Sequence, residues 1–171
     1  MKKNLVLTGM MGVGKSTIGR AVADKLSMNF TDIDKDIEKK QNLNIRDIFK
    51  DKGELYFRNL EEKTTIESLN KSNTVISLGG GAFINSKIRE LILKTSISFW
   101  LDLEPKEIEL RVKNSKKRPL LNNDNLFKTL NKIYNERKNT YDLANFRIDC
   151  NKMRQEQIVG KVLNLYVDFR D

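Results

Sequence analysis

Histidine is absent from the 171 residues of this chain. Imidazole general bases, histidine metal ligands and histidine-based catalytic triads are therefore excluded, and acid–base chemistry has to come from carboxylates, lysines or water. Cysteine is almost absent too, because the single Cys150 has no partner for an internal disulfide and belongs to no cluster with metal-ligand spacing. This composition suits a reducing compartment and argues against a structural zinc site.

Long hydrophobic runs are also missing, since the apolar stretches have only the length of a strand. The chain begins with a basic residue pair, as a secretory signal does, but glycines and Lys15 interrupt the apolar stretch after a few residues. We therefore expect a soluble, cytoplasmic protein with no membrane partner.

Basic residues outnumber acidic ones by 32 to 23, which gives a net charge of +9. Such a charge suits anionic small molecules or nucleic acid, or it serves only solubility. The lysines are scattered among acids, and aromatic side chains do not alternate with basic ones as on a base-stacking surface. We expect no nucleic-acid partner.

The pattern of the chain predicts one α/β domain over residues 1–171, because short β-rich runs alternate with helical patterns. We predict a three-layer α/β/α arrangement around a five-stranded parallel sheet. The predicted strands are residues 3–8, 29–33, 74–78, 96–102 and 146–150. The predicted helices are residues 15–26, 35–40, 45–51, 54–70, 86–94, 105–114, 125–143 and 155–168. The polar segment 113–125, KNSKKRPLLNNDN, has no period of its own and is predicted to be a mobile lid.

A phosphate-binding loop is the strongest motif. Residues 9–16, GMMGVGKS, fit G-x-x-x-x-G-K-[ST] between a hydrophobic strand and a helix. Glycines let the backbone aim several N–H groups inward, and the helix N-terminus adds positive potential where phosphates bind. We expect Lys15 to bridge the β- and γ-phosphates and Ser16 to bind Mg²⁺. The predicted ATP-binding residues here are Gly12, Val13, Gly14, Lys15, Ser16 and Thr17.

A GTPase switch is an alternative for such a loop, and it needs a guanine-reading Asn-Lys-x-Asp sequence late in the chain. No such sequence is present: the Asn-Lys pairs at residues 70–73 and 131–134, for example, both lack the aspartate. The sequence therefore favours another class of nucleotide-binding protein.

Two carboxylates, Asp32 and Asp34, lie at the carboxyl end of the second predicted strand, at positions i and i+2. Paired acids beside a phosphate-binding loop suit a magnesium nucleotide and a polyol: Asp32 can orient metal-bound water, and Asp34 can accept hydrogen bonds from substrate hydroxyls. The alternative is that Asp34 or Asp36 only caps the next helix.

Six motifs in order, GMMGVGKST, DID, GELYFRNLEE, SLGGGA, KRPLL and ERKNTY, resemble the shikimate kinases over nearly the whole chain. The phosphate-binding loop is common to many proteins, but FRxxE followed by GGG and RPLL is much narrower. The resemblance implies a P-loop kinase fold and an ATP-dependent enzyme. Its reaction transfers the γ-phosphoryl group of Mg-ATP to the 3-hydroxyl of shikimate, giving shikimate 3-phosphate and ADP in aromatic amino acid biosynthesis.

The resemblance also implies roles for residues of the acceptor region, about 33–62, and beyond it. Asp34 holds the ring hydroxyls, Arg58 and Arg137 hold the carboxylate, and a planar guanidinium suits that task because it forms two parallel hydrogen bonds. Glu61, at i+3 from Arg58, can hold that guanidinium in place. The remaining implied acceptor residues are the backbone of Gly79, Gly80 and Gly81 and the aromatic wall of Phe49 and Phe57, for which core packing is the alternative.

Two further arginines complete the implied site. Arg118, in the predicted lid, swings over the phosphates and is catalytic together with Lys15 and Asp34, and Arg111 stacks on adenine. The sequence departs from the family at Thr65, where an aliphatic residue is usual, and at residues 151–155, which lack a proline that some relatives place near adenine.

Other small-molecule P-loop kinases, such as a gluconate kinase or a nucleoside monophosphate kinase, are the alternative enzymes. The acceptor motifs favour neither of them. Because no coiled-coil repeat or apolar patch is evident, we expect a monomer.

Overall fold

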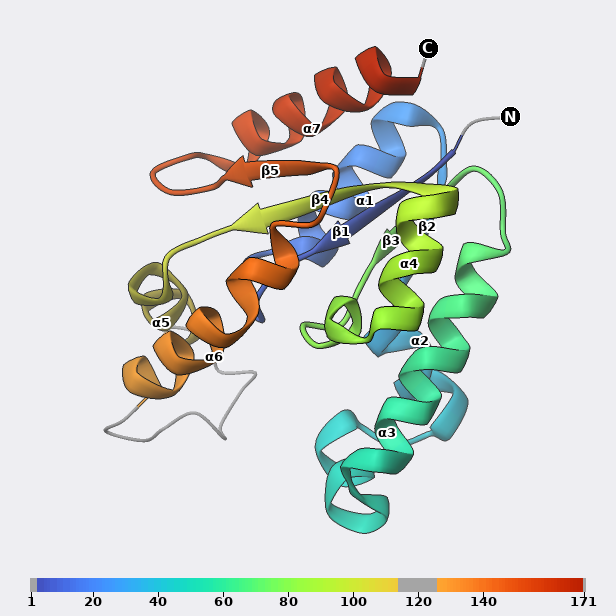
Figure 1. Cartoon of the computed structure of the whole chain (residues 1–171), viewed down its shortest axis with the longest axis vertical. Coiled ribbons are helices and arrows are strands. Elements are labelled where there is room, and N and C mark those ends of the chain that lie inside the picture. The colour runs from blue at the N-terminus through green and yellow to red at the C-terminus, as the bar shows by residue number, and fades with distance from the viewer. Residues whose placement is uncertain (1–2, 114–125, 171) are drawn as a thin grey trace.

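The structure is a computed structural model, and it describes residues 3–113 and 126–170. Its centre is a five-stranded sheet in the order β2-β3-β1-β4-β5, and every neighbouring pair of strands is parallel. The predicted five-stranded parallel sheet is therefore confirmed (Figure 1). The strands are β1 (Asn4–Thr8), β2 (Asn29–Asp32), β3 (Thr74–Ser77), β4 (Ser96–Asp102) and β5 (Phe146–Asp149).

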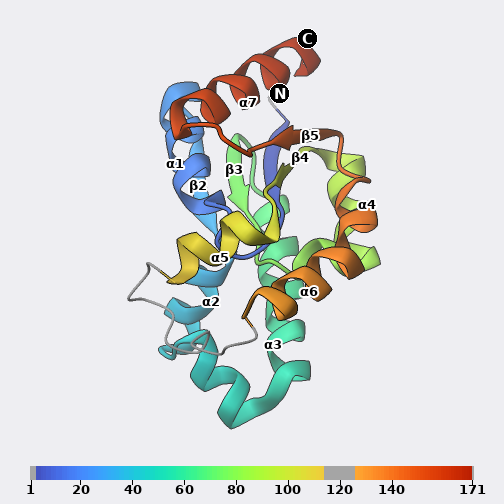
Figure 2. The same cartoon turned by 90° about the vertical axis from the view of Figure 1, so that its left-hand side faces the viewer.

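Helices cover both faces of the sheet, as the three-layer prediction requires. On one face α1 (Lys15–Leu26) packs against α7 (Gln155–Arg170), and on the other α4 (Ser86–Thr95) packs on β4 with α3 (Ile45–Leu69) beside it. Figure 2 shows α1 and α4 on opposite sides of the strands. The other helical elements are α2 (Ile33–Gln41), the 3₁₀ turn η1 (Ala82–Ile84), α5 (Pro105–Lys113) and α6 (Leu126–Tyr141).

The burial of the strands follows their place in the sheet. All residues of β1, β3 and β4 are buried, whereas the edge strands β2 and β5 are each partly exposed. Inner strands of a parallel sheet have helices on both faces, so their sequences are nearly continuous apolar runs. This is why the pattern of the chain located them correctly.

Side-chain caps begin three of the helices. The carboxylate of Asp32 accepts a hydrogen bond from the Lys35 backbone N–H (3.2 Å), and Asn44 and Asn85 begin α3 and α4 in the same way. The cap of α2 is thus Asp32, not Asp34 or Asp36, which lie in the first turn, where the helix dipole stabilises negative charge. Consequently α2 begins at Ile33, two residues before the predicted start.

Helix α3 contains a sharp break at Gly53, whose φ of 83° and ψ of 169° are not helical. Nothing lies within 4 Å of the position that a Cβ would take at Gly53, so the backbone conformation and not space requires glycine there. The two predicted helices 45–51 and 54–70 are the two arms of this kinked element. The predicted lid falls outside the described residues, except for Lys113, which ends α5.

No helix in the described ranges is both long enough and apolar enough to cross a membrane. This finding agrees with the charged composition of the chain.

The Cys150 thiol provides a test of the core. The side chain is fully buried, it donates a hydrogen bond to the Ile148 carbonyl oxygen (3.3 Å), and burial raises its pKa to about 12. Because the pKa of a free thiol is about 8.5, the reactive thiolate at pH 8 is roughly a thousandfold rarer in the folded protein. We expect native protein to resist a disulfide reagent at pH 8 and to react at the rate of unfolding in denaturant. Rapid labelling without denaturant would contradict this packing.

Candidate active site

A cleft of about 1040 Å³ lies at the carboxyl ends of the strands. In open α/β sheets this edge is where ligands bind, at the point where the chain changes direction across the sheet. Most of the residues predicted to bind ATP, magnesium or the acceptor line the cleft: Gly12, Gly14, Lys15, Ser16, Thr17, Asp32, Asp34, Phe49, Phe57, Arg58, Gly80, Gly81 and Arg137.

The phosphate-binding loop joins β1 to α1, with glycine where the backbone needs it. Gly9, Gly12 and Gly14 have φ values of 133°, 78° and 99°, a region that other residues rarely adopt. Among the described residues no side chain caps α1 and no acid lies in its first turn. The first N–H groups of α1 are therefore available to an anion.

Lys15 and Ser16 lie where the motif predicts, at the start of α1 in the cleft. The Lys15 ammonium is largely buried and donates to the carbonyl oxygens of Gly9 and Met10, both at 2.9 Å. The Ser16 hydroxyl donates to the Asp32 carboxylate, the same carboxylate that caps α2. The two residues predicted to hold magnesium are therefore in direct contact.

Helix α5 packs against the phosphate-binding loop. The Arg111 guanidinium donates to the Val13 carbonyl oxygen (3.1 Å), and a Cβ at Gly12 would lie 3.1 Å from the Val112 side chain. Arg111 thus reaches the loop from a part of the chain 98 residues away. Val13 itself is buried beside the cleft, and Arg118 lies outside the described residues.

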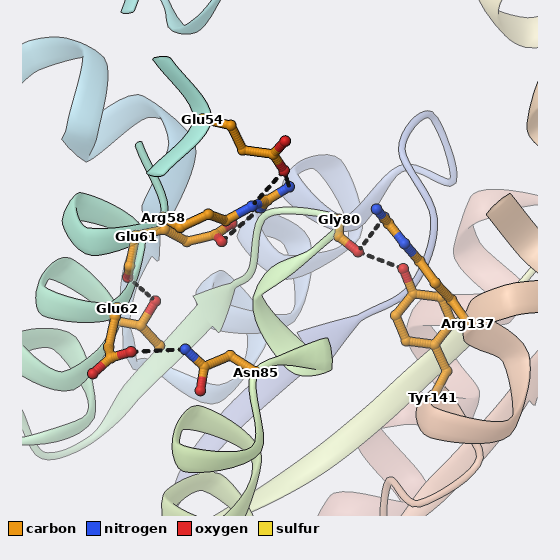
Figure 3. Close-up of polar contacts among 9 residues, drawn as sticks. Glu54, Arg58, Glu61, Glu62, Gly80, Asn85, Arg137 and Tyr141 are labelled. Atoms are coloured by element: carbon orange, nitrogen blue, oxygen red, sulfur yellow. Dashed lines mark hydrogen bonds and ion pairs between the residues drawn. The ribbon is translucent and has the colours of Figure 1, made fainter. Parts of the chain in front are cut away.

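Arg58 lies between two carboxylates on α3 (Figure 3). Its Nη1 donates to Glu61 (2.8 Å), as predicted, and its Nε and Nη2 donate to one oxygen of Glu54 (3.3 and 3.2 Å). Burial raises the pKa of Glu61, and the Arg58 guanidinium opposes that rise. Burial lowers the pKa of Arg58, but Glu61 and Glu54 outweigh it and hold this pKa above its ordinary value.

Gly79, Gly80 and Gly81 form a glycine loop after β3, and two of them, Gly79 and Gly81, make room for acidic and basic side chains. None of these three described glycines has a φ in the left-handed region, so a need for positive φ does not explain them. A Cβ at Gly79 would lie 2.6 Å from a Glu61 oxygen, and one at Gly81 would lie 2.6 Å from Arg58 Nη1. Gly79 is buried and does not line the cleft itself, but the position of its Cβ faces Glu61 and Asp34, which do.

Helix α6 contacts the glycine loop on the side opposite to Arg58 of α3. Arg137 Nη1 donates to the Gly80 carbonyl oxygen (3.1 Å), and the buried Tyr141 hydroxyl donates to the same oxygen (Figure 3). Burial raises the pKa of Tyr141, which keeps the hydroxyl a donor. The sequence analysis assigned no role to Tyr141. The sequence signal for such a role is its position one helical turn after Arg137, which puts both side chains on the same face of the helix.

A second contact anchors α6 to the sheet. The Tyr134 hydroxyl donates to the buried carboxylate of Asp102 (2.9 Å), which also accepts from Arg147 (2.8 Å). Asp102 ends β4 and Arg147 belongs to β5. Helix α6, which carries Arg137, is therefore attached both to the glycine loop and to the ends of β4 and β5.

Phe49 and Phe57 belong to the cleft and to the apolar packing at once. Their ring centroids are 4.7 Å apart, Phe57 is buried, and the Phe49 ring packs against the core cluster while both line the cleft. The aromatic wall and core packing, which were alternatives for the sequence, are thus compatible. Thr65 is buried as well and donates to the Glu61 carbonyl oxygen (2.7 Å), so the hydroxyl is satisfied within α3.

A family model described as "Shikimate kinase" matches residues 11–166. This chain belongs to the shikimate kinase family. The chain is 44% identical over 161 residues to a shikimate kinase from Sulfurihydrogenibium sp., with 94% of this chain and 96% of that protein covered. The family resemblance of the motifs and the predicted P-loop kinase fold are thereby confirmed.

Solved structures agree with the family. A shikimate kinase from Acinetobacter baumannii in complex with shikimate has a TM-score of 0.91 and 31% identity, covering 98% of this chain and 94% of that one. A gluconokinase from Sinorhizobium meliloti has a TM-score of 0.65 at 15% identity, covering 99% and 94%, so it shares the fold alone. The enzyme is an ATP-dependent kinase, as the family requires.

The glycine loop yields a prediction about the geometry of the site. In Gly81→Ala the new methyl group collides with the Arg58 guanidinium, so we expect that guanidinium to shift and its bond to Glu61 to break, with a stability loss of about 1–3 kcal/mol. The matched control is Gly80→Ala, whose Cβ would lie 3.4 Å or more from its neighbours. Crystal structures and denaturant unfolding of both variants test this, and an unmoved Arg58 in Gly81→Ala would contradict it.

Proposed function

We propose that this shikimate kinase transfers the γ-phosphoryl group of ATP to the 3-hydroxyl of shikimate, with the phosphate-binding loop and the glycine loop holding the two substrates side by side. One observation carries the proposal. Arg58 and Arg137 come from helices on either side of the glycine loop and line the same cleft as Lys15. A cleft with a phosphate site at one end and two guanidinium groups at the other suits an acceptor with a carboxylate.

The acceptor end supports a cyclic hydroxy acid. Arg58 and Arg137 can pair with a carboxylate through parallel charge-assisted hydrogen bonds, which fix its orientation better than a lysine could. Asp34, half-buried in the same cleft, can accept hydrogen bonds from ring hydroxyls. The rings of Phe49 and Phe57 supply the apolar wall against which a carbon ring packs.

Magnesium is proposed to accompany ATP, and the residues at the phosphate-binding loop fit it. Ser16 and Asp32 offer oxygen donors in contact with each other, and oxygen is the ligand that Mg²⁺ prefers. Among the described residues no group of three or more acidic or cysteine side chains could hold a metal ion. Mg²⁺ at this site would therefore take its other ligands from phosphate oxygens and water. A magnesium ion held by Ser16 and Asp32 would neutralise phosphate charge.

The protein's part in the chemistry is alignment and charge neutralisation. The acceptor oxygen forms a bond to the γ-phosphorus, the bond from that phosphorus to the β–γ bridging oxygen breaks, and ADP departs with the electron pair. Lys15 supplies positive charge at the phosphates, and Asp34 orients the hydroxyl and accepts its proton. Arg118 and Arg111 are proposed to add charge over the phosphates and a surface for adenine.

The setting of the enzyme is part of the proposal. One continuous cluster of buried apolar residues includes side chains from the sheet and both helical layers, which supports a single domain. The lone buried cysteine and the charged surface support a cytoplasmic monomer.

The test is ADP release from purified protein with Mg-ATP and, separately, shikimate, gluconate or AMP. We expect ADP formation only with shikimate, because it combines a carboxylate for the two guanidinium groups with a carbon ring for the wall of Phe49 and Phe57. Gluconate has the carboxylate but no ring, and AMP has no carboxylate. Turnover with gluconate or AMP alone would keep the kinase fold and overturn the acceptor assignment. If no ADP forms with any of the three acceptors, the proposed catalytic activity is wrong.

Arg137→Ala tests the acceptor site separately from the nucleotide site. We expect the KM for shikimate to rise about 30-fold or more, since a buried charge-assisted pair is lost, while the KM for ATP changes by less than about twofold. Steady-state kinetics with each substrate varied in turn measure both values. A similar rise in both would contradict a role confined to the acceptor.

A further inference from the structure

Arg58 is neutralised by a carboxylate before any acceptor arrives. Two acidic side chains share its guanidinium, and they differ in burial: the Glu61 side chain is 3% exposed, whereas that of Glu54 is 67% exposed. The bond to Glu61 is also shorter, 2.8 Å against 3.2 and 3.3 Å for Glu54. Glu61 is therefore a fixed partner, and Glu54 is an exchangeable one.

The position of Glu54 on the guanidinium matters for substrate binding. It accepts from Nε and Nη2 together, which is one of the two edges through which an arginine binds a carboxylate with two parallel bonds. The opposite side of the guanidinium, Nη1, donates to Glu61 and faces Gly81. Glu54 thus occupies Nε and Nη2, the pair of donors that Glu61 does not use and that could bind an acceptor carboxylate.

Charge repulsion adds to the competition between Glu54 and an acceptor carboxylate for Arg58. With Glu54 and Glu61 in place, one guanidinium already faces two carboxylates, and an acceptor carboxylate would be a third. Like charges that share one site destabilise one another. Because exposed ion pairs contribute little to stability, Glu54 can turn into solvent at small cost.

The backbone permits this movement. Glu54 directly follows Gly53, where the kink of α3 lies, and it begins the arm of the helix that carries Arg58. The Glu54 side chain is largely in solvent, whereas its partner Arg58 lines the cleft. A change of rotamer releases Arg58 without moving α3.

We propose that Glu54 is a specificity-determining residue that stands in for the acceptor's carboxylate at Arg58 and has to be displaced by it. This inference rests on the proposed function and deepens it. An acceptor with a carboxylate replaces Glu54, whereas a hydroxylated ring without one leaves Glu54 in place and meets a carboxylate at the edge of its site. Glu54 therefore lowers the affinity for every acceptor and lowers it most for those that cannot take its place.

The experiment compares Glu54→Gln and Glu54→Ala with the unaltered enzyme. We expect each to lower the KM for shikimate about two- to fivefold, the range that one exposed ion pair supports, and to leave the KM for ATP unchanged. Shikimate methyl ester, which lacks the charge, should gain more than shikimate does, so the preference for the acid over the ester should shrink. The matched control is Asp51→Asn, which removes the same charge from an exposed position three residues earlier.

Several outcomes would overturn the inference. An unchanged or raised KM for shikimate in both Glu54 variants would mean that Glu54 holds Arg58 in its productive position and does not compete with the acceptor. An equal effect in Asp51→Asn would mean that the loss of one negative charge acts through the electrostatic potential of the surface and not through the contact with Arg58. If the unaltered enzyme makes no ADP with shikimate, the proposed function fails on its own, before any variant is compared.

Discussion

The pairing of β1 with β3 on one side and β4 on the other is the constraint on which the site depends. Parallel pairing brings the carboxyl ends of these strands to one edge, and the Leu78 N–H extends the ladder by donating to the Leu7 carbonyl oxygen (3.1 Å). The phosphate-binding loop and the glycine loop therefore leave the sheet side by side. A Cβ at Gly80 would lie 3.4 Å from the Met11 nitrogen, so the two loops are in contact.

The two acceptor arginines are held by different physical means. Arg58 is held by carboxylates on its own helix, at i−4 and i+3, which makes its charge depend on acidic neighbours. Arg137 donates to the Gly80 backbone carbonyl, a neutral acceptor that leaves its positive charge uncompensated by that contact. Arg58 is therefore paired with a carboxylate that can be exchanged, whereas Arg137 contributes positive charge to the cleft. Gly81 supplies the space that the Arg58 guanidinium needs, and Gly80 supplies the carbonyl oxygen that Arg137 binds.

The sequence predicted most of the secondary structure, because buried strands of a parallel sheet and amphipathic helices have distinct patterns. The kink at Gly53 was also predictable, since two helical patterns flank a glycine. The sequence left a cap at Asp34 or Asp36 only as an alternative to a functional role, because closely spaced carboxylates after a strand suit capping and metal binding equally well. The structure gives the cap to Asp32 through its bond to the Lys35 N–H, and the same carboxylate contacts Ser16.

The sequence by itself determined the phosphate-binding loop, because every part of that site lies within eight consecutive residues and its glycines follow from local backbone geometry. Only the tertiary structure decided which residues meet at the acceptor end. Arg137 and Tyr141 reach the Gly80 carbonyl across 57 and 61 residues, and Gly79 and Gly81 leave room there for Glu61, Asp34 and Arg58. Such contacts depend on how the helices dock on the sheet, and no local pattern of the chain encodes that distance.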